Sequence, residues 1–235
     1  MMVGNDAFAR TLAKLESQFR KMDMALRNTR CMYNGGNMEL TYDLALRLED
    51  VMERATLLAR ALPAYTGNPN AAQEVENLIA ARIPVDIGYT IEGWFCVRIP
   101  LLLPKKAEGS ASYVRSFLYP ALQSFFKDKP PVRYRDCVLI YRHVYDEARP
   151  ERQRRDHDNI EINMASDTVA LYVMQDDAPD VCRHYYCSAS GCTERTEIYV
   201  VPASDFPQWL VTEKVLPCEG VMLHDFVHKE PQKDM

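Results

Sequence analysis

The chain has 235 residues, of which 47% are hydrophobic and 26% are charged, a composition typical of a globular protein rather than a disordered one. No apolar run approaches the length of about 18 residues that a membrane-spanning helix needs, and the first residues lack the features of a signal peptide. We therefore expect a cytoplasmic protein with no membrane partner. The net charge of −5 gives no global argument for binding nucleic acid, so that role would need a local basic patch or bridging metal ions.

The first 62 residues predict two helices. Apolar side chains recur at spacings of three and four residues from Phe8 to Leu26, and again from Leu44 to Leu62. The apolar seam of the first helix consists of Phe8, Leu12, Leu15, Phe19, Met22 and Leu26. A Gly-Gly turn signal at residues 34–37 separates the helices, so we expect an antiparallel helical hairpin. Its seams either pack on each other or on the main domain, or they bind a partner protein.

A mixed α/β body follows this hairpin. We place the boundary after residue 66, which gives a helical hairpin at 1–66 and an α+β domain with a C-terminal extension at 67–235. The expected strands span residues 85–90, 94–103, 137–145, 183–188 and 196–201, with helices at 113–127 and between 158 and 176. The predicted fold class is α+β, a mixed sheet packed with helices.

The most informative stretch runs from residue 154 to residue 177. Carboxylates precede the predicted helix at Asp156 and Asp158, and others follow it at Asp176 and Asp177. If the two pairs fold onto one point, they repel one another unless a hard divalent cation with oxygen ligands joins them. A simpler alternative is that the first pair caps the helix and the second pair forms a turn.

The order Asp-x-Asp-Asn, helix, Asp-Asp, strand resembles the active-site region of the RusA family of Holliday junction resolvases. Asp156, Asp158 and Asn159 match the first acidic motif of that family, and Asp176 and Asp177 match the second. The strand and the basic residues before the first motif also fit, as do the upstream β-hairpin and helix. The chain is also similar to uncharacterised proteins of Gram-positive gut bacteria and their mobile elements.

This resemblance covers about residues 83–202 and implies a RusA-like fold with a structure-selective DNA endonuclease activity in recombination and repair. Asp156, Asp158 and Asp177 would be catalytic and, with Asp176, would hold Mg²⁺, or Mn²⁺ in its place. The metal would polarise the phosphodiester and activate a water for in-line attack. Branched DNA is the implied substrate, and a homodimer would supply a site for each of the paired nicks. The candidate DNA contacts are Lys105, Lys106, Arg152, Arg154 and Arg155, and Asn159 supports the site.

One position departs from the family. The lysine that follows the second Asp by four residues, and on which activity depends, is replaced here by Ile162, and no lysine lies between Lys129 and Lys214. This departure favours a second hypothesis, a catalytically silent RusA-like module that binds branched DNA or a recombination partner. A third hypothesis is an interaction protein that works through its helical hairpin and has no nucleic-acid role.

The seven cysteines are spread along the chain, and without an export signal we expect reduced thiols. Cys182, His184, Cys187 and Cys192 lie close enough in sequence to suggest zinc, although their spacing is not that of a Cys-x-x-Cys knuckle. In a strand, Cys182 and His184 would share one face and Cys187 would take the other, so packed thiols are the simpler prediction. His157 is either a catalytic base or a solvated loop residue.

Overall fold

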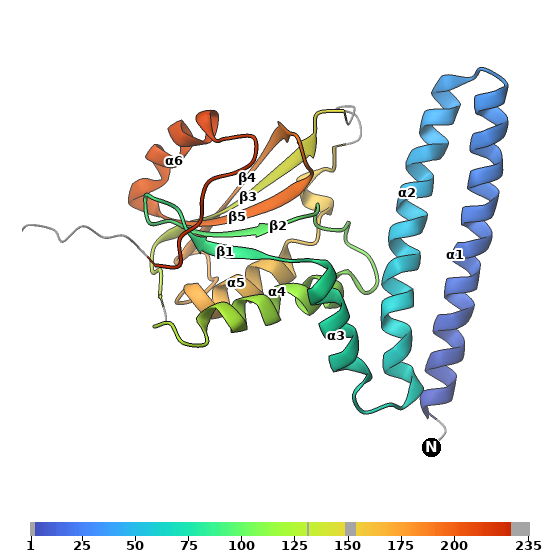
Figure 1. The fold of residues 1–235 in the computed structure, drawn as a ribbon, viewed down its shortest axis with the longest axis horizontal. Coiled ribbons are helices and arrows are strands. Elements are labelled where there is room, and N and C mark those ends of the chain that lie inside the picture. Colours follow the sequence, from blue (N-terminus) through green and yellow to red (C-terminus); the bar gives the residue numbers. More distant parts are fainter. Residues whose placement is uncertain (1–2, 131, 149–153, 227–235) are drawn as a thin grey trace, which may run out of the picture. The chain divides into compact units, whose positions relative to one another are not determined.

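The computed structural model describes residues 3–130, 132–148 and 154–226 (Figure 1). These residues form two compact units. The first comprises the chain up to Leu78 together with Pro104–Tyr113, and the second comprises Ile79–Leu103 and the chain from Val114 onward. The predicted boundary after residue 66 therefore lies inside the first unit. No helix in the described ranges is long and apolar enough to cross a membrane.

The first unit contains the predicted helical hairpin, made of α1 (Val3–Asn34) and α2 (Met38–Ala61). Gly36 turns the chain with a φ of +73°, a conformation that glycine adopts without strain. Asn37 then caps α2, because its side-chain oxygen accepts the backbone N–H of Leu40 at 3.1 Å. Beyond α2 the chain continues through a short 3-10 turn, η1 (Leu62–Thr66), into α3 (Ala71–Arg82).

The seam of α1 differs from the predicted one. Leu15 is buried, but Phe19 is 52% exposed and Leu26 is 48% exposed. Of the other predicted seam residues, Phe8, Leu12 and Met22 are partly buried, as is Thr29, which the seam did not include. A single neighbouring helix screens only a narrow line of α1, so apolar residues beside that line stay open to solvent. Of the two alternatives, Phe19 and Leu26 do not fit packing within the chain, and a partner that covers them stays a prediction.

The second unit is built on one five-stranded sheet. Its strands are β1 (Asp86–Tyr89), β2 (Phe95–Ile99), β3 (Cys137–Asp146), β4 (Cys182–Gly191) and β5 (Arg195–Pro202). They lie in the order β1-β2-β5-β3-β4, and β3 and β4 are parallel while the other neighbours are antiparallel. A parallel pair needs a crossover, and here that crossover contains α5 (Asn163–Val173). The mixed sheet confirms the predicted α+β class.

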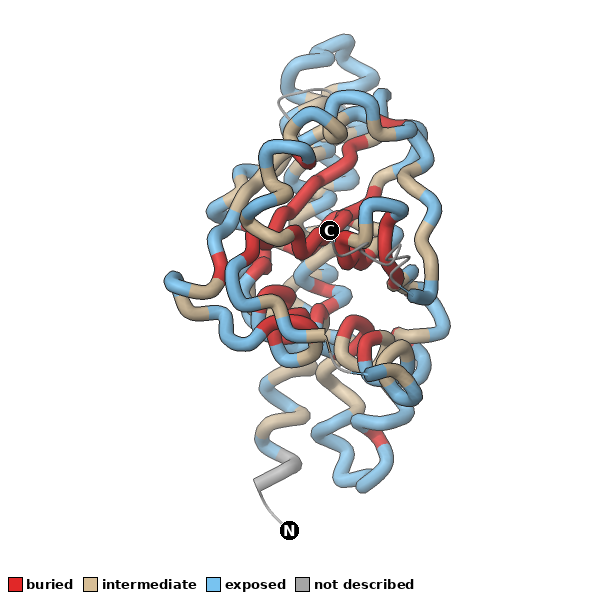
Figure 2. The backbone as a smooth tube through the Cα atoms, turned by 90° about the vertical axis from the view of Figure 1, so that its left-hand side faces the viewer, coloured by how far each residue is buried: buried red, intermediate tan, exposed pale blue. Residues whose placement is uncertain are grey.

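Helices cover both faces of this sheet (Figure 1). α4 (Ser110–Phe126) and α5 pack on one face, where Phe126 meets Phe95 of β2 with ring centroids 5.8 Å apart. α6 (Phe206–Thr212) covers the other face through the buried Trp209, which packs against Tyr199. Buried positions accordingly follow the strands and the helices beside them (Figure 2). Short 3-10 turns lie at η3 (His157–Asn159), η4 (Ala203–Asp205) and η5 (Glu213–Val215).

A buried carboxylate lies at the centre of the sheet. Glu197 on β5 is fully buried and accepts hydrogen bonds from Arg142 at 2.8 Å, from Arg195 at 2.6 Å and from the Tyr199 hydroxyl at 3.0 Å. Burial by itself raises the pKa of Glu197, but Arg142 and Arg195 outweigh it, and the net pKa is lowered. The glutamate therefore stays ionised and holds the arginines of two strands together.

We expect Glu197→Gln to lower the free energy of unfolding by about 3–5 kcal/mol, because the buried arginines lose their counter-charge. Since the pKa of Glu197 is below its ordinary value of 4.5 in the folded state, this stabilisation is fully present above pH 4.5 and is lost as the pH falls through the folded pKa. Urea denaturation at several pH values measures both effects.

The matched control for that experiment is Asp136→Asn. Asp136 and Arg183 form an equally short ion pair of 2.6 Å, but both side chains are more than 60% exposed. Solvent screens such a pair, so its loss should cost about 0–1 kcal/mol. Equal effects of the two substitutions would contradict the central role given to Glu197.

Candidate functional site

The first acidic pair lies on a short turn that follows β3. Asp156 precedes η3 in an extended conformation, and its carbonyl accepts the backbone N–H of Asn159 at 3.1 Å. The side chains of Asp156, Asp158 and Asn159 are exposed, whereas the next residue, Ile160, is fully buried. The buried isoleucine fixes the turn against the sheet and leaves the two carboxylates facing solvent.

The two arginines before this turn, Arg154 and Arg155, form hydrogen bonds with other residues of the chain. The Arg155 backbone N–H donates to the Tyr145 hydroxyl at 3.0 Å, and its guanidinium donates to the carbonyl of Leu103. Arg154 donates to the Ser190 hydroxyl at 2.8 Å. Both predicted DNA contacts thus also anchor the turn to neighbouring strands. Arg152, a third predicted contact, lies outside the described residues.

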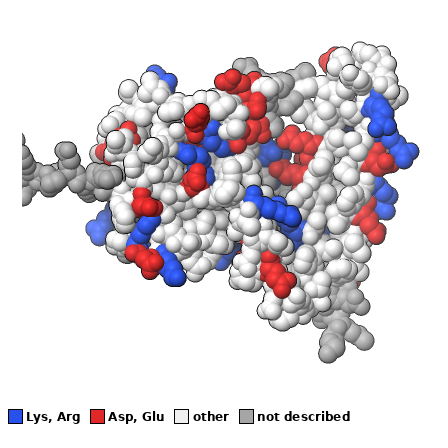
Figure 3. All heavy atoms as spheres, viewed as in Figure 1, with Lys and Arg blue, Asp and Glu red and all other residues white. Residues whose placement is uncertain are grey.

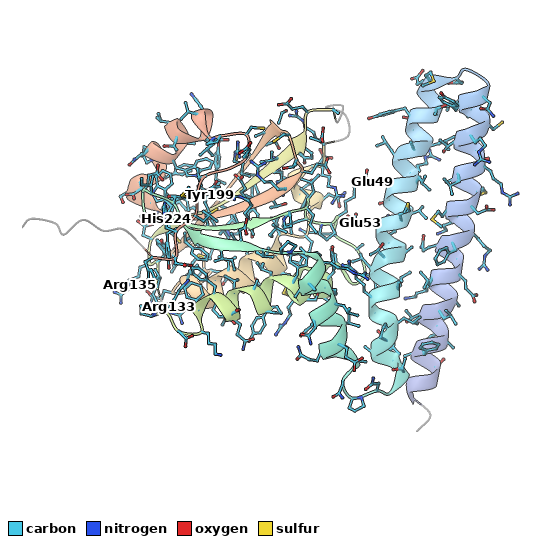
Figure 4. All side chains as sticks on the ribbon, viewed as in Figure 1. Glu49, Glu53, Arg133, Arg135, Tyr199 and His224 are labelled. Carbon is cyan, nitrogen blue, oxygen red and sulfur yellow. The ribbon has the colours of Figure 1, made fainter. Side chains whose placement is uncertain are left out.

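The second acidic pair is positioned by the end of α5. Arg133 donates to the carbonyls of Leu171 and Met174 at 3.0 and 2.9 Å, and so caps the C-terminus of the helix (Figure 4). The chain then turns at Asp176 and Asp177, where the Asp176 side chain accepts the Asp177 backbone N–H at 2.8 Å. Both carboxylates are exposed.

The two ends of the acidic stretch each act on a residue of β4. The ring of His157, which separates Asp156 from Asp158, stacks on Tyr186 with centroids 5.7 Å apart. At the other end, the pKa of His184 is raised, chiefly by its hydrogen bond with Cys182 and to a smaller extent by the charge of Asp177, while burial lowers it. His184 and Tyr186 are two residues apart on one face of the strand, about 7 Å. The edge strand β4 therefore lies between both ends.

One carboxylate at this site was missed from the sequence. The pKa of Asp167, on α5, is raised by desolvation, by Asp177 and by Glu161. The sequence signal was the position of Asp167 inside the predicted helix between residues 158 and 176. The structure buries the residues on both sides of it, Ser166 and Thr168, to 5% and 4% exposure. Asp167 and Asp177 form a carboxylate pair that proton uptake or a cation would stabilise.

The oxygen-only chemistry of these carboxylates fits a hard cation such as Mg²⁺. Their arrangement does not complete a ligand set. Across residues 3–130, 132–148 and 154–226, no three His, Cys, Asp or Glu side chains are placed to share a metal ion. The ligand set Asp156, Asp158, Asp176 and Asp177 therefore stays a prediction.

Lys105 and Lys106, the remaining predicted DNA contacts, belong to the first unit. Lys105 lies 3.8 Å from Asp50, whereas Lys106 is exposed and lines a pocket of about 440 Å³. The pocket combines four cations with one carboxylate. It is lined by Lys14, Ser17, Gln18, Lys21, Arg54, Leu58, Lys106, Ala107 and Glu108. Elsewhere Lys and Arg are interspersed with Asp and Glu on the face drawn in Figure 3.

Residues 4–221 match the model of DUF6100, a family of unknown function. The chain belongs to the DUF6100 family. The match spans both compact units, so the helical hairpin and the sheet are parts of one family architecture. No curated protein matches the chain.

The four residues that suggested a zinc site in this DUF6100 protein lie in three separate places. These residues are Cys182, His184, Cys187 and Cys192. Cys182 faces Cys137 and His184, and hydrogen bonds from both lower its pKa to about 5. Cys187 packs against the core beneath α6, and Cys192 contacts Cys218. The alternation of faces along β4 separates Cys187 from Cys182, as expected for packed thiols.

His143 gives the DUF6100 sheet a pH-sensitive position. It is fully buried beside His157, no hydrogen-bond partner of either ring nitrogen is found among the described residues, and burial, His157 and Arg155 lower its pKa to about 4. Between pH 6.5 and about 4 the unfolded chain binds a proton here that the folded chain does not, so stability falls as the pH falls.

Between pH 7 and pH 4, the titration of His143 should lower the free energy of unfolding of the native chain by about 3 kcal/mol. We expect His143→Phe to lack this loss, and denaturation at the two pH values measures it. His184→Gln should act in the opposite direction and lose stability at low pH, because the pKa of His184 is raised by its hydrogen bond with Cys182. An unchanged pH profile in His143→Phe would mean that the pKa of His143 is the same in the folded and unfolded chain, and would contradict the lowered pKa.

Proposed function

We propose that this chain is a RusA-like domain that binds branched DNA without cutting it. The order of elements supports the resemblance, since a β-hairpin (β1-β2), α4, β3, α5 and the pair β4-β5 follow one another along the chain. The two acidic motifs lie on either side of α5, in the crossover between the parallel strands. This is the setting that the resemblance requires of them.

The environment of Ile162 is the observation that supports DNA binding without cleavage. This residue occupies the position of the family lysine, and it is 8% exposed. Its carbonyl accepts the Tyr141 hydroxyl at 3.1 Å, which ties the position to the centre of β3. The cations closest to it in sequence, Arg154 and Arg155, donate to protein acceptors. A cation aimed at a transition-state phosphate is therefore not supplied by these residues.

The basic pocket of the first unit supports binding to a phosphate backbone. Lys14 and Arg54 are offset by Glu108 and Asp50, at 2.7 and 3.1 Å. Lys21 and Lys106 line the same pocket and are exposed, so their charges are open to an anion. Lysine contacts to phosphates release counterions and give affinity that falls with salt.

A homodimer belongs to this proposal. A four-way junction has paired arms, and two copies related by a two-fold axis would present the same surface to each pair. Sedimentation of the chain alone and with a junction tests this, since a monomer on the junction would contradict it.

One observation favours the second candidate, a Mg²⁺-dependent endonuclease of the Holliday junction resolvase type. The pKa of Asp167 is raised by desolvation and by Asp177, which is the behaviour of carboxylates that a divalent cation would neutralise. Asp158 and Asp177 would then be essential, together with Mg²⁺ or Mn²⁺.

For DNA binding, we expect Lys106→Glu to weaken affinity for a labelled four-way junction and to reduce the slope of log affinity against log salt by about 1, the value of one lost phosphate contact. Arg27→Glu is the matched control, because Arg27 is on α1 but outside the pocket and pairs with Asp23 at 3.0 Å. Titration by fluorescence anisotropy at several salt concentrations measures both. Equal losses in the two variants would show that only net charge matters.

For cleavage, we expect the native chain with Mg²⁺ or Mn²⁺ to bind the junction and leave its strands intact on a denaturing gel. Cleavage that disappears in Asp158→Asn and Asp177→Asn, but persists in the control Asp180→Asn, would overturn this expectation and establish the nuclease. The control is exposed, as Asp177 is, and lies three residues after it.

A further inference from the structure

Two exposed cysteines lie in contact at the end of the sheet. The Sγ atoms of Cys192 and Cys218 are 3.1 Å apart, although the residues are 26 positions apart in sequence. The backbone N–H of Cys192 also donates to the Cys218 sulfur at 3.0 Å. Cys192 directly follows β4, and Cys218 lies in a turn closed by the hydrogen bond from the Gly220 N–H to the Pro217 carbonyl at 3.0 Å.

The backbone on both sides of this pair is closely packed. A Cβ atom at Gly191 would lie 2.7 Å from Val144 and 3.4 Å from the Cys218 carbonyl, so only glycine permits this approach. A Cβ atom at Gly220 would lie 2.7 Å from the Arg98 guanidinium, which donates to the carbonyl of Val221. The fold therefore holds Cys218 against the β4–β5 turn.

The C-terminal segment is fixed again further along. His224 and Tyr89 of β1 exchange two backbone hydrogen bonds of 2.8 Å each. His224 is labelled in Figure 4. Between Cys218 and His224 the segment thus runs from the end of β4 to β1, past Arg98. Arg98 lies 4.0 Å from the buried Glu197, so this segment borders the charged centre of the sheet.

The other cysteines are differently placed. Cys31 is exposed on α1, in the first unit, while Cys96, Cys137 and Cys182 are buried. A small disulfide in solution can reach the exposed thiols readily, and among the described cysteines Cys192 and Cys218 are the exposed pair in contact. Proximity makes the second step of thiol–disulfide exchange intramolecular.

We propose that Cys192 and Cys218 form a reversible disulfide, a redox modification site that ties the C-terminal segment to the β4–β5 turn. A thiolate of one cysteine attacks a small-molecule disulfide, forms a mixed disulfide and releases one small thiolate. The second cysteine then attacks the protein sulfur of that bond and releases the other. The dithiol loses two protons and two electrons, and the small disulfide is reduced to two thiols.

The two sulfurs need to approach by about 1 Å to reach the bonded distance of about 2.05 Å. Because both backbones are already held in place, this closure adds a covalent link where the fold has a contact. The link restricts the unfolded chain and so stabilises the second unit. In a reducing compartment such a pair acts as a redox sensor rather than a permanent bridge. This inference is independent of the proposed DNA binding.

The test uses the full chain incubated with glutathione disulfide, followed by mass spectrometry under non-reducing conditions. We expect the pair to lose two hydrogens, a proteolytic peptide that links Cys192 to Cys218, and a rise of several degrees in the unfolding temperature. Dithiothreitol should reverse all three. Repeating the reaction in urea should abolish the preference for this pair, because the preference comes from the fold.

Cys192→Ser and Cys218→Ser are the matched variants. Each should keep its remaining thiol as a mixed disulfide with one glutathione, and neither should show the rise in unfolding temperature. The proposal is overturned if the native chain carries separate glutathione adducts on Cys192 and Cys218 without a cross-link, or if the cross-link forms but leaves the unfolding temperature unchanged.

Discussion

The structure of the second unit depends on a buried cluster of charges centred on the carboxylate of Glu197. It lies at the centre of β5, the middle strand, and it holds Arg142 of β3 and Arg195 by hydrogen bonds. Ionised side chains enter a sheet interior only when they are paired and hydrogen-bonded, so each of these residues requires the others. Arg98 extends the same row to β2 and, through Val221, to the C-terminal segment. The charge thereby joins the strands to the segment that crosses them.

The opposite face of the sheet presents the candidate site, and β4 determines its form. As an edge strand, β4 leaves His184 exposed and Tyr186 partly exposed, and these residues meet the two ends of the acidic stretch. Arg133 and Tyr145 fasten those ends to the sheet. An acidic turn of this kind, anchored by buried neighbours and open to solvent, suits the approach of a large ligand better than the enclosure of a small one.

The acidic site and the basic pocket would make different demands on DNA, if DNA is the partner as proposed. Carboxylates repel phosphates unless a cation intervenes, whereas Lys21 and Lys106 attract them directly. If the chain binds DNA without cutting it, the basic residues alone contact the phosphates, and the carboxylates do not need to approach them. Asp177 raises the pKa of Asp167, so the electrostatic potential around these carboxylates is negative. Cutting would require a divalent ion to reverse the sign of that potential.

The sequence by itself determined the α+β class, the hairpin, the five strands and the acidic motifs, because periodicity and turn residues act locally. It did not place Phe19 in solvent, since exposure depends on which line of α1 meets a neighbour. Nor did it pair Asp177 with Asp167, or bring Cys192 to Cys218. Cys192 and Cys218 are 26 positions apart, so only the path of the C-terminal segment decides that they meet. The effect of Asp177 on Asp167 depends on how the chain turns after α5.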